Sequence, residues 1–186
     1  MRRVDLEHVV AVAAQISDEV EFVVIGSQAI LGTEPDPPGA MQRSMEADIY
    51  PRDAPEKAEK IDGSLGDGSL FHRTYGYYAH GVGPETAKAP RGWEERLIAV
   101  EVPPRVGSTK SSIARCLEAH DLVLAKCARG EARDWEFAHQ AMQAGLVRLE
   151  VLLGRVDDLP LERERRDSIR RMLDARVARN KPPPPG

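Results

Sequence analysis

The segment EFVVIG, residues 21–26, is a short apolar run that ends in glycine. A run of this length and composition is typical of a strand that is buried within a sheet. The segment SQAIL that follows, residues 27–31, can form one or two helical turns, with Ser27 near their start. A buried strand must be covered by other elements, so we expect a sheet with helices packed on it.

The spacing of apolar residues and the positions of glycine and proline predict the other helices, strands and loops. Apolar residues at helical spacing, or a glycine stop, indicate helices at residues 4–17, 54–62, 117–130, 131–146, 147–154 and 161–178. Alternation, or an aromatic face, indicates strands at residues 44–51, 72–82 and 96–102. Proline, glycine and polar residues gather in predicted loops at residues 32–40, 63–69 and 103–111.

These elements divide the chain into three parts. Residues 1–111 contain the strands and are expected to form an α/β core, whereas residues 112–180 are expected to form a helical subdomain that completes the functional site. The last residues, 181–186, read KPPPPG and are predicted to be a disordered tail. The predicted fold class is therefore α+β, a small mixed sheet with flanking helices followed by a helical C-terminal subdomain.

The bulk properties exclude several classes of protein. The 186 residues favour one compact domain or one domain with a small appendage, and no apolar run approaches the about 20 residues that cross a bilayer. Asp5, Glu7 and His8 interrupt the N-terminal segment, which argues against a signal peptide and favours a cytoplasmic protein without a membrane partner. Cys116 and Cys127 have no metal-ligand or disulfide-scaffold spacing and are expected to be buried thiols. The five histidines contain no HxxxH-type pair, which argues against a histidine zinc site.

The charge of the chain bears on its partners. A net charge of −4 argues against a strongly basic nucleic-acid surface, and no recognition of a DNA sequence is expected. The charge is uneven, because residues 160–186 hold eight basic and four acidic residues. This basic segment can be the solvated face of a helix, or it can be a stripe that follows the phosphates of a polynucleotide.

Two carboxylates stand one residue apart in the predicted strand at residues 44–51. Alternation places Glu46 and Asp48 on the same face of that strand, where they repel each other unless something relieves their charge. Exposure to water can satisfy such a pair, and a divalent cation is the other solution. Mg²⁺ prefers one or two carboxylates together with the phosphates of a substrate.

The turn after the first predicted strand adds to this pattern. Gly26 and Ser27 can offer backbone N–H groups and a hydroxyl to a phosphate, and glycine allows the phosphate to approach closely. The same pair is also compatible with an ordinary strand-to-helix turn. Together with the two acids, it describes a site for a metal-bound nucleoside triphosphate that is attacked in line at its α-phosphorus.

The apolar strand, the Gly-Ser pair and the acid-x-acid strand resemble the nucleotidyltransferase (polymerase-beta-like) superfamily. The segment CLEAHDLVLAKCARGEARDWEFAHQAM, residues 116–142, resembles a segment of the nucleotidyltransferase-like toxins of the AbiEii and MenT group. With VIGSQAIL, SMEADIYP and FHRTYGYYAHGVGPET, the similarity spans about residues 20–145. The resemblance implies a nucleotidyltransferase-like fold, a Mg²⁺ cofactor and an NTP substrate, with a pyrimidine nucleotide such as CTP favoured.

The resemblance also implies roles for individual residues. Gly26 and Ser27 would hold the triphosphate, and Glu46 and Asp48 would bind Mg²⁺. Lys126 would contact the phosphates as a mobile point charge.

Three further residues have implied or candidate roles. Asp134 would complete the site as a metal ligand, as a base or as the residue that orients Lys126. Ser44 would be a regulatory phosphorylation point, because a phosphate there would repel the two acids and occupy the nucleotide site. Glu101 is a candidate third acid, ranked below Asp134 because strand alternation can point it outward.

Ordinary structural roles are the alternatives for several of these residues. Lys126 can be a favourable cation near a helix C-terminus, and Asp134 can form a surface ion pair with Arg133 or Arg129. Three tyrosines are expected to pack on the sheet rather than to stack on bases, namely Tyr75, Tyr77 and Tyr78.

The sequence departs from the superfamily's common form in two ways. Glu46 stands where aspartate is usual, and the gap between Ser27 and Glu46 is longer than usual. The leading hypothesis is a Mg²⁺-dependent toxin of a toxin–antitoxin pair, which transfers a nucleoside monophosphate to the 3′ end of a tRNA and has a cognate antitoxin as protein partner. The alternatives are transfer to a protein or small-molecule hydroxyl, and a catalytically inactive binding module of the same fold.

Overall fold

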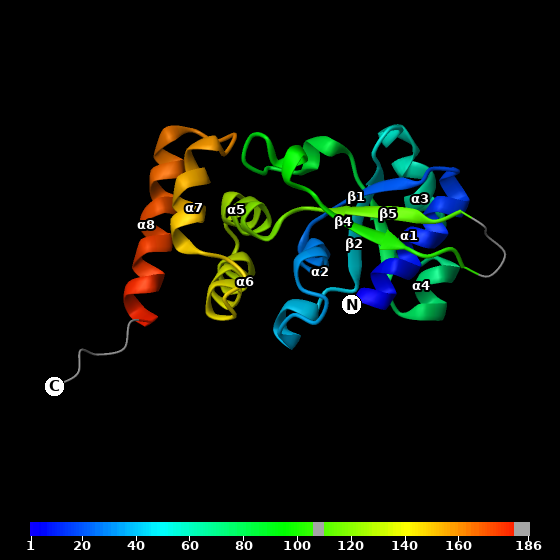
Figure 1. The fold of residues 1–186 in the computed structure, drawn as a ribbon, viewed down its shortest axis with the longest axis horizontal. Coiled ribbons are helices and arrows are strands. Elements are labelled where there is room, and N and C mark those ends of the chain that lie inside the picture. The colour runs from blue at the N-terminus through cyan, green and yellow to red at the C-terminus, as the bar shows by residue number, and fades with distance from the viewer. Residues whose placement is uncertain (106–109, 181–186) are drawn as a thin grey trace.

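The computed structural model describes residues 1–105 and 110–180, and its centre is a five-stranded mixed sheet (Figure 1). The strands occur in the order β3-β2-β1-β5-β4, with bounds β1 Glu21–Ile25, β2 Glu46–Pro51, β3 Tyr78–Gly81, β4 Ile98–Val102 and β5 Ser112–Cys116. β1 runs antiparallel to β2 and parallel to β5, while β3 is parallel to β2 and β4 is antiparallel to β5. The last four residues of β1 are buried, so the prediction of a buried central strand is confirmed.

The helices of the first half pack around this sheet. They are α1 Arg3–Ser17, α2 Ile30–Thr33, α3 Ala58–Leu65 and α4 Leu70–Tyr75. α1 packs against α3 and β5, α3 lies against β3, and α2 contacts β4 and β5. Leu6 and Ile61 are fully buried where α1 and α3 meet the sheet, as expected for helices that each present one apolar face. Short 3₁₀ turns fill the connections, at Ser27–Ala29, Gly39–Gln42, Pro55–Lys57, Pro84–Thr86 and Trp93–Arg96.

In the described part of the chain, four helices follow the last strand and gather at one end of the molecule (Figure 1). They are α5 Ala119–Arg129, α6 Ala132–Gln143, α7 Leu149–Arg155 and α8 Arg163–Asn180, with a 3₁₀ turn at Val156–Asp158. Gly130 ends α5 in the left-handed region with a φ of 81°, and its N–H binds the carbonyl of Lys126. This turn lays α6 against α5. The predicted fold class, a mixed sheet with flanking helices and a helical C-terminal part, is therefore confirmed. None of the described helices is long and apolar enough to cross a bilayer.

One predicted element was wrong. Residues 72–82 were predicted as a single strand, but the structure forms α4 up to Tyr75 and starts β3 only at Tyr78. Ser69 caps the start of α4, because its hydroxyl accepts the N–H of His72, and Gly76 ends the helix with a φ of 77°. Two of the aromatic residues that suggested a strand face, Tyr75 and Tyr77, instead belong to a cluster of rings with His8 of α1 and Phe71 of α4.

The strand β5 was not predicted. It occupies residues 112–116, the first five residues of the range that was assigned to the helical subdomain, and it pairs with both β1 and β4. The helical elements accordingly begin after it, at Ala119. Both cysteine side chains are buried, as predicted, and burial raises the pKa of the Cys116 thiol to about 12. The predicted tail at residues 181–186, and residues 106–109 of the predicted loop 103–111, lie outside the described residues.

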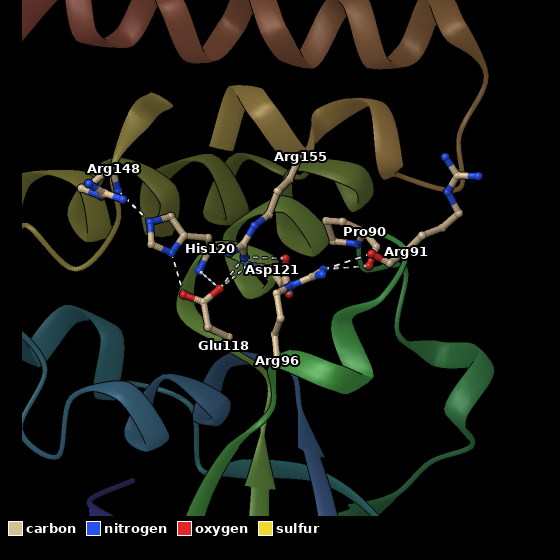
Figure 2. A network of polar contacts seen from close by, with 8 residues as sticks. All are labelled: Pro90, Arg91, Arg96, Glu118, His120, Asp121, Arg148 and Arg155. Carbon is tan, nitrogen blue, oxygen red and sulfur yellow. Dashed lines mark hydrogen bonds and ion pairs between the residues drawn. The ribbon is translucent and has the colours of Figure 1, made fainter. Parts of the chain in front are cut away.

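A buried polar network joins the sheet half to the helical half (Figure 2). Asp121 of α5 has no exposed surface, and its carboxylate accepts hydrogen bonds from Arg96 Nε at 2.7 Å and Arg155 Nη1 at 3.0 Å. Arg96 also donates to the backbone carbonyls of Pro90 and Arg91. A buried carboxylate is tolerated when it is paired in this way. The network therefore fixes the segment between β3 and β4 against α5 and α7.

Candidate active site

The two predicted acids lie side by side on β2, next to the end of β1. Asp48 pairs with Ile25 in the antiparallel ladder, and the turn at Gly26 follows immediately. Glu46 stands two residues earlier on the same face, and both acids are half-buried. The acid pair and the Gly-Ser turn therefore lie together where β1 ends beside β2, as the sequence pattern predicts.

A histidine that the sequence analysis did not single out completes this cluster. His80 of β3 pairs with Asp48 in the parallel ladder, and its Nδ1 lies 3.1 Å from Glu46 Oε1 and 3.0 Å from Asp48 Oδ1. Tyr78, two residues earlier, donates its hydroxyl to Glu46 Oε2 at 3.0 Å. The alternation of Tyr78 and His80 was the available sequence signal, but alternation does not reveal which strand lies beside them.

The surroundings separate the pKa values of the two acids. Burial, together with the hydrogen bond and repulsion from Glu46, raises the pKa of Asp48 to about 6. Burial also acts on Glu46, but hydrogen bonds with Asp48 and Tyr78 and the charge of His80 outweigh it, so the pKa of Glu46 is lowered. The two carboxylates are close enough that both resist being ionised together. A cation between them would remove this repulsion.

Gly26 is required by the close approach of Asp48. Its φ of 68° lies in the left-handed region, and a Cβ at this position would lie 1.9 Å from Asp48 Oδ2. Real Cβ atoms essentially never come this close to another atom, and residues other than glycine rarely adopt such a φ. The predicted role of Gly26 was to admit a phosphate, and the structure adds that its missing side chain makes room for the acid.

Ser27 and Lys126 join the two halves of the molecule at the site. Lys126 Nζ, from α5, donates a hydrogen bond of 2.8 Å to Ser27 Oγ and lies 4.6 Å from the centre of the Phe137 ring. The Lys126 side chain is 8% exposed. Burial lowers its pKa, and the attraction of Asp134 opposes this effect only in part. The ammonium is therefore a desolvated cation, and its electrostatic interaction with charged groups in the adjacent cavity is strong.

Asp134 lies behind this lysine and not among the metal-type ligands. It has no exposed surface, its Oδ1 lies 3.7 Å from Lys126 Nζ, and it holds Arg129 through both of its oxygens. Its Oδ2 also accepts the N–H of Glu131 at the start of α6. Arg133, the other expected partner, pairs with Glu131 instead. Of the three implied roles of Asp134, the geometry suits the orientation of Lys126.

Arg129 was singled out only as a possible ion-pair partner, yet it faces the site. Asp134 is the first cause of its raised pKa, and Asp48 contributes through its charge. Arg129 lines both cavities described below. The sequence signal was its position three residues after Lys126, which places both on one face of a helix.

Two cavities meet at these residues. The first has a volume of about 390 Å³ and is lined by the two acids, by Ser27 and by four basic side chains, Arg43, Lys126, Arg129 and Arg133. The second has a volume of about 230 Å³ and an apolar wall that includes Ile25, Leu117 and Leu122. Ser27, Asp48, Lys126 and Arg129 line both. A ligand in either cavity would therefore reach the same acid and the same lysine.

The remaining predicted residues divide into those inside and those outside the site. Ser44 lines the first cavity, and its Oγ accepts the N–H of Glu46 at 3.2 Å. Glu101 is exposed on the edge strand β4, with β1 and β5 between it and β2. It lines neither cavity. Tyr75 and Tyr77 belong to the aromatic cluster with His8, whereas Tyr78 supports Glu46.

Several basic side chains of α8 make contacts within the chain. Arg166 Nη1 donates to the carbonyl of Asp157, and Arg170 forms an ion pair with the Asp157 carboxylate at 2.9 Å. Arg165 lies near the carbonyl of Arg129. These contacts agree with a packed and solvated helix, the plainer of the two interpretations of the basic segment.

Comparison with known proteins assigns the chain to a family. A model of the family described as "Nucleotidyltransferase of unknown function (DUF6036)" matches residues 4–177. The chain belongs to this family. It is therefore a nucleotidyltransferase-superfamily protein, in agreement with the resemblance drawn from its motifs. A comparison with curated proteins found no match, and a comparison with solved structures found none either.

A DUF6036 nucleotidyltransferase is expected to act on an NTP with a divalent metal, and the residues of this chain fit such an ion. Glu46, Asp48 and His80 each offer one ligand atom, and these atoms lie within 4.8 Å of one another. Carboxylate oxygens suit hard divalent cations, and imidazole nitrogen suits transition metals. A divalent cation between the two carboxylates would relieve the repulsion from Glu46 that helps to raise the pKa of Asp48.

Proposed function

We propose that this chain transfers a nucleoside monophosphate from an NTP to an acceptor hydroxyl with the help of a divalent metal, Mg²⁺ being the expected ion. One observation carries the proposal. The acids Glu46 and Asp48 and the pair formed by Ser27 and Lys126 line one basic cavity of about 390 Å³, although they come from both halves of the chain. The acids alone would suit only a cation, and the basic side chains alone would suit only an anion. A cavity lined by both suits a metal-bound triphosphate.

The residues of the chain have separable roles in this reaction. Glu46 and Asp48 would hold the metal, which would supply a positive charge to the phosphate oxygens as the acceptor oxygen attacks. Lys126 would hold the β- and γ-phosphates as a desolvated point charge, with Arg129 as a second cation. The new bond joins the acceptor oxygen to the α-phosphorus, the α–β phosphate bond breaks, the pyrophosphate leaves, and the acceptor hydroxyl loses its proton.

Asp134 would act as a positioning residue behind these cations. Its carboxylate is buried, lines neither cavity and pairs with Arg129 and Lys126. Such a residue fixes two flexible side chains in one arrangement before the substrate arrives, so less is lost when the phosphates bind. The geometry supports this role over that of a metal ligand, because Asp134 is not part of the group of Glu46, Asp48 and His80.

For the acceptor, we propose the 3′ end of a tRNA, and for the biological role a toxin of the AbiEii and MenT kind that blocks translation and is held in check by an antitoxin. The resemblance of residues 116–142 supports this finer assignment. The second cavity is compatible with it, because an apolar pocket of about 230 Å³ beside Asp48 could take a terminal nucleobase. The same pocket would also take a small-molecule acceptor, so the experiment must compare the two.

Control by phosphorylation would act through Ser44. Its hydroxyl lies within the first cavity and accepts the N–H of Glu46. A phosphate on this oxygen would add about two negative charges beside two carboxylates and fill the space that the triphosphate needs. Modification of Ser44 would therefore switch the site off without unfolding the protein.

The experiment is a transfer assay with the purified full chain. The protein is mixed with total tRNA and each α-labelled NTP in turn, with Mg²⁺, beside Asp48→Asn as the matched variant. Label on the tRNA 3′ end that is absent with Asp48→Asn supports nucleotidyl transfer to tRNA and names the base. Label on a protein or small molecule overturns the tRNA acceptor but keeps nucleotidyl transfer. No transfer to any acceptor overturns the proposed activity and favours an inactive binding module.

A further inference from the structure

We propose that His80 is the third protein ligand of the metal and that it makes the site favour a transition metal such as Mn²⁺ over Mg²⁺. This inference deepens the proposed function and rests on it. It concerns a residue of this chain that neither the motif pattern nor the family description assigns to the site.

The arrangement of atoms around His80 is the first support. A single nitrogen, Nδ1, lies about equally far from one oxygen of each acid, 3.1 Å from Glu46 Oε1 and 3.0 Å from Asp48 Oδ1. The pairing of Asp48 with His80 in the β2–β3 ladder fixes this proximity, because directly paired residues project from the same face of a sheet. The three donor atoms therefore lie close together, within 4.8 Å of one another.

The other oxygen of Glu46 is already engaged, which leaves its Oε1 to face the histidine. Tyr78 donates its hydroxyl to Glu46 Oε2. Outer contacts of this kind orient metal-ligating carboxylates and are a regular part of metal sites. Glu46 Oε1 is thus held toward His80 Nδ1, and Asp48 Oδ1 lies 3.0 Å from the same nitrogen.

The position of His80 at the edge of the sheet also suits a ligand. β3 is the outermost strand on its side, and half of the His80 side chain is exposed. The ring can therefore adjust to an incoming ion without disturbing the core. A histidine that served only as a fixed counter-ion would need one acid, whereas this nitrogen contacts both.

The chemistry of the donor set predicts the choice of metal. Two carboxylates alone suit Mg²⁺, which keeps several waters and binds oxygen. Imidazole nitrogen adds affinity for first-row transition metals and little for Mg²⁺. A site of two carboxylates and one imidazole should therefore bind Mn²⁺ more tightly than a site with the carboxylates alone, and its preference over Mg²⁺ should depend on His80.

The test measures metal binding without turnover. The full chain is stripped of metal and titrated with MnCl₂, and the EPR signal of free Mn²⁺ gives the bound fraction. Pulsed EPR on the bound ion then detects modulation from a coordinated ¹⁴N, and histidine labelled with ¹⁵N confirms its source. The variants are His80→Ala, His80→Asp and Asp48→Asn, and the matched control is His139→Ala, a histidine of α6 outside the group of Glu46, Asp48 and His80.

The expected result has three parts. The wild type binds Mn²⁺ with a ¹⁴N signal, and His80→Ala loses that signal and weakens Mn²⁺ binding by about tenfold or more, the scale seen when support of a metal ligand is removed. His80→Asp regains binding without the ¹⁴N signal and lets Mg²⁺ compete better. His139→Ala behaves like the wild type. Melting curves show whether each variant is folded, and His80→Asp provides a second test of the nitrogen signal if His80→Ala is not.

Other outcomes would overturn the inference and can be told apart from failure of the proposed function. Bound Mn²⁺ without a ¹⁴N signal, or equal binding by His80→Ala, removes His80 from the ligand set but leaves a metal at the two acids. Equal binding by Asp48→Asn places the ion elsewhere and overturns this inference together with the metal roles proposed for the acids. If the wild type binds neither Mn²⁺ nor Mg²⁺, the metal-dependent function fails as well.

Discussion

Lys126 Nζ donates a 2.8 Å hydrogen bond to Ser27 Oγ, although the two residues lie 99 positions apart in the chain. The bond links the turn after the first strand to the first helix of the C-terminal half. It places a buried ammonium at the point where both cavities meet. The site therefore exists only when the two halves are packed together, and the buried network around Asp121 is what holds them (Figure 2).

Lys126→Met should abolish most of the transfer activity while leaving the fold intact. Methionine keeps the length and apolar stem of the side chain but removes the charge on the phosphates. Loss of one preorganised cation or donor typically lowers the rate by about 10²–10³-fold. We expect this fall in kcat/KM for NMP transfer, with an unchanged circular dichroism spectrum. Lys60→Met on the exposed face of α3 is the control, and equal loss in both variants would contradict the role of Lys126.

Asp134→Asn should weaken the positioning of Lys126 and Arg129 without changing metal binding. Asparagine is nearly isosteric, but it removes the charge that holds Arg129 and Lys126. We expect transfer to fall by about 10–100-fold, as for loss of supporting contacts in an active site. Mn²⁺ binding at the acid pair should stay as in the wild type. Loss of Mn²⁺ binding in this variant would instead make Asp134 a metal ligand.

Gly26→Ala should damage both stability and the acid pair. The new methyl group would collide with Asp48 Oδ2, and the φ of 68° is strained for alanine. Strain of this kind costs about 1–3 kcal/mol of unfolding free energy. Chemical denaturation measures the loss, and Mn²⁺ binding should weaken in parallel.

Gly63→Ala is the matched control for this change. Gly63 lies within α3, and a Cβ there would meet no atom within 4 Å. Alanine favours a helix interior over glycine by about 0.5–1 kcal/mol, so this variant should be more stable than the wild type. A similar loss of stability in both variants would show that the effect of Gly26→Ala is not due to Asp48.

These residues also show how far the sequence could predict the structure. The strand at residues 21–26 and the acids Glu46 and Asp48 carry their signal locally, in an apolar run and in a spacing of two. The strand β5 was missed because its inward-facing residues are small, Ser112, Ala114 and Cys116, and do not read as a strand. Periodicity within a segment cannot show which strands are neighbours.

The group of Glu46, Asp48 and His80 shows the same limit, because local patterns did not reveal that His80 belongs to it. His80 joins the acids only because β3 lies beside β2, and the residues before it form a helix rather than the predicted strand. Asp134 was recognised by its motif, but its burial against Arg129 comes from the turn between α5 and α6. Local sequence patterns therefore could not predict which distant residues would lie together at the site.

Glu46→Asp tests whether the glutamate limits or supports metal binding and transfer activity. The superfamily's usual aspartate would be shorter by one methylene, and it would retreat from Tyr78 and His80 on β3. We therefore expect this variant to bind Mn²⁺ more weakly, by about tenfold, and not to gain activity. Tyr78→Phe, which removes only the hydroxyl, should show part of the same loss. An increase in transfer by Glu46→Asp would mean that the glutamate limits the enzyme.

Stability at low pH should depend on Glu118, the residue that caps α5 (Figure 2). Burial would raise its pKa, but hydrogen bonds with His120 and Arg155 outweigh burial and lower the pKa from 4.5 to about 2. A carboxylate with a lowered pKa stabilises the fold fully above its unfolded value. That stability is lost as the pH falls from about 4.5 through about 2, because the unfolded state then binds the proton first.

Urea denaturation at pH 7 and at pH 3 measures this dependence in the wild type and in Glu118→Gln. The wild type should lose stability between the two pH values, and Glu118→Gln should lose less, with a difference of about 1–2 kcal/mol. Glu21 has a similarly low pKa because of Arg115 and Arg52, so it contributes equally to both proteins and cancels in the comparison. Identical pH dependence in the two proteins would show that Glu118 is not held in its charged form by the network that joins the sheet to the helices.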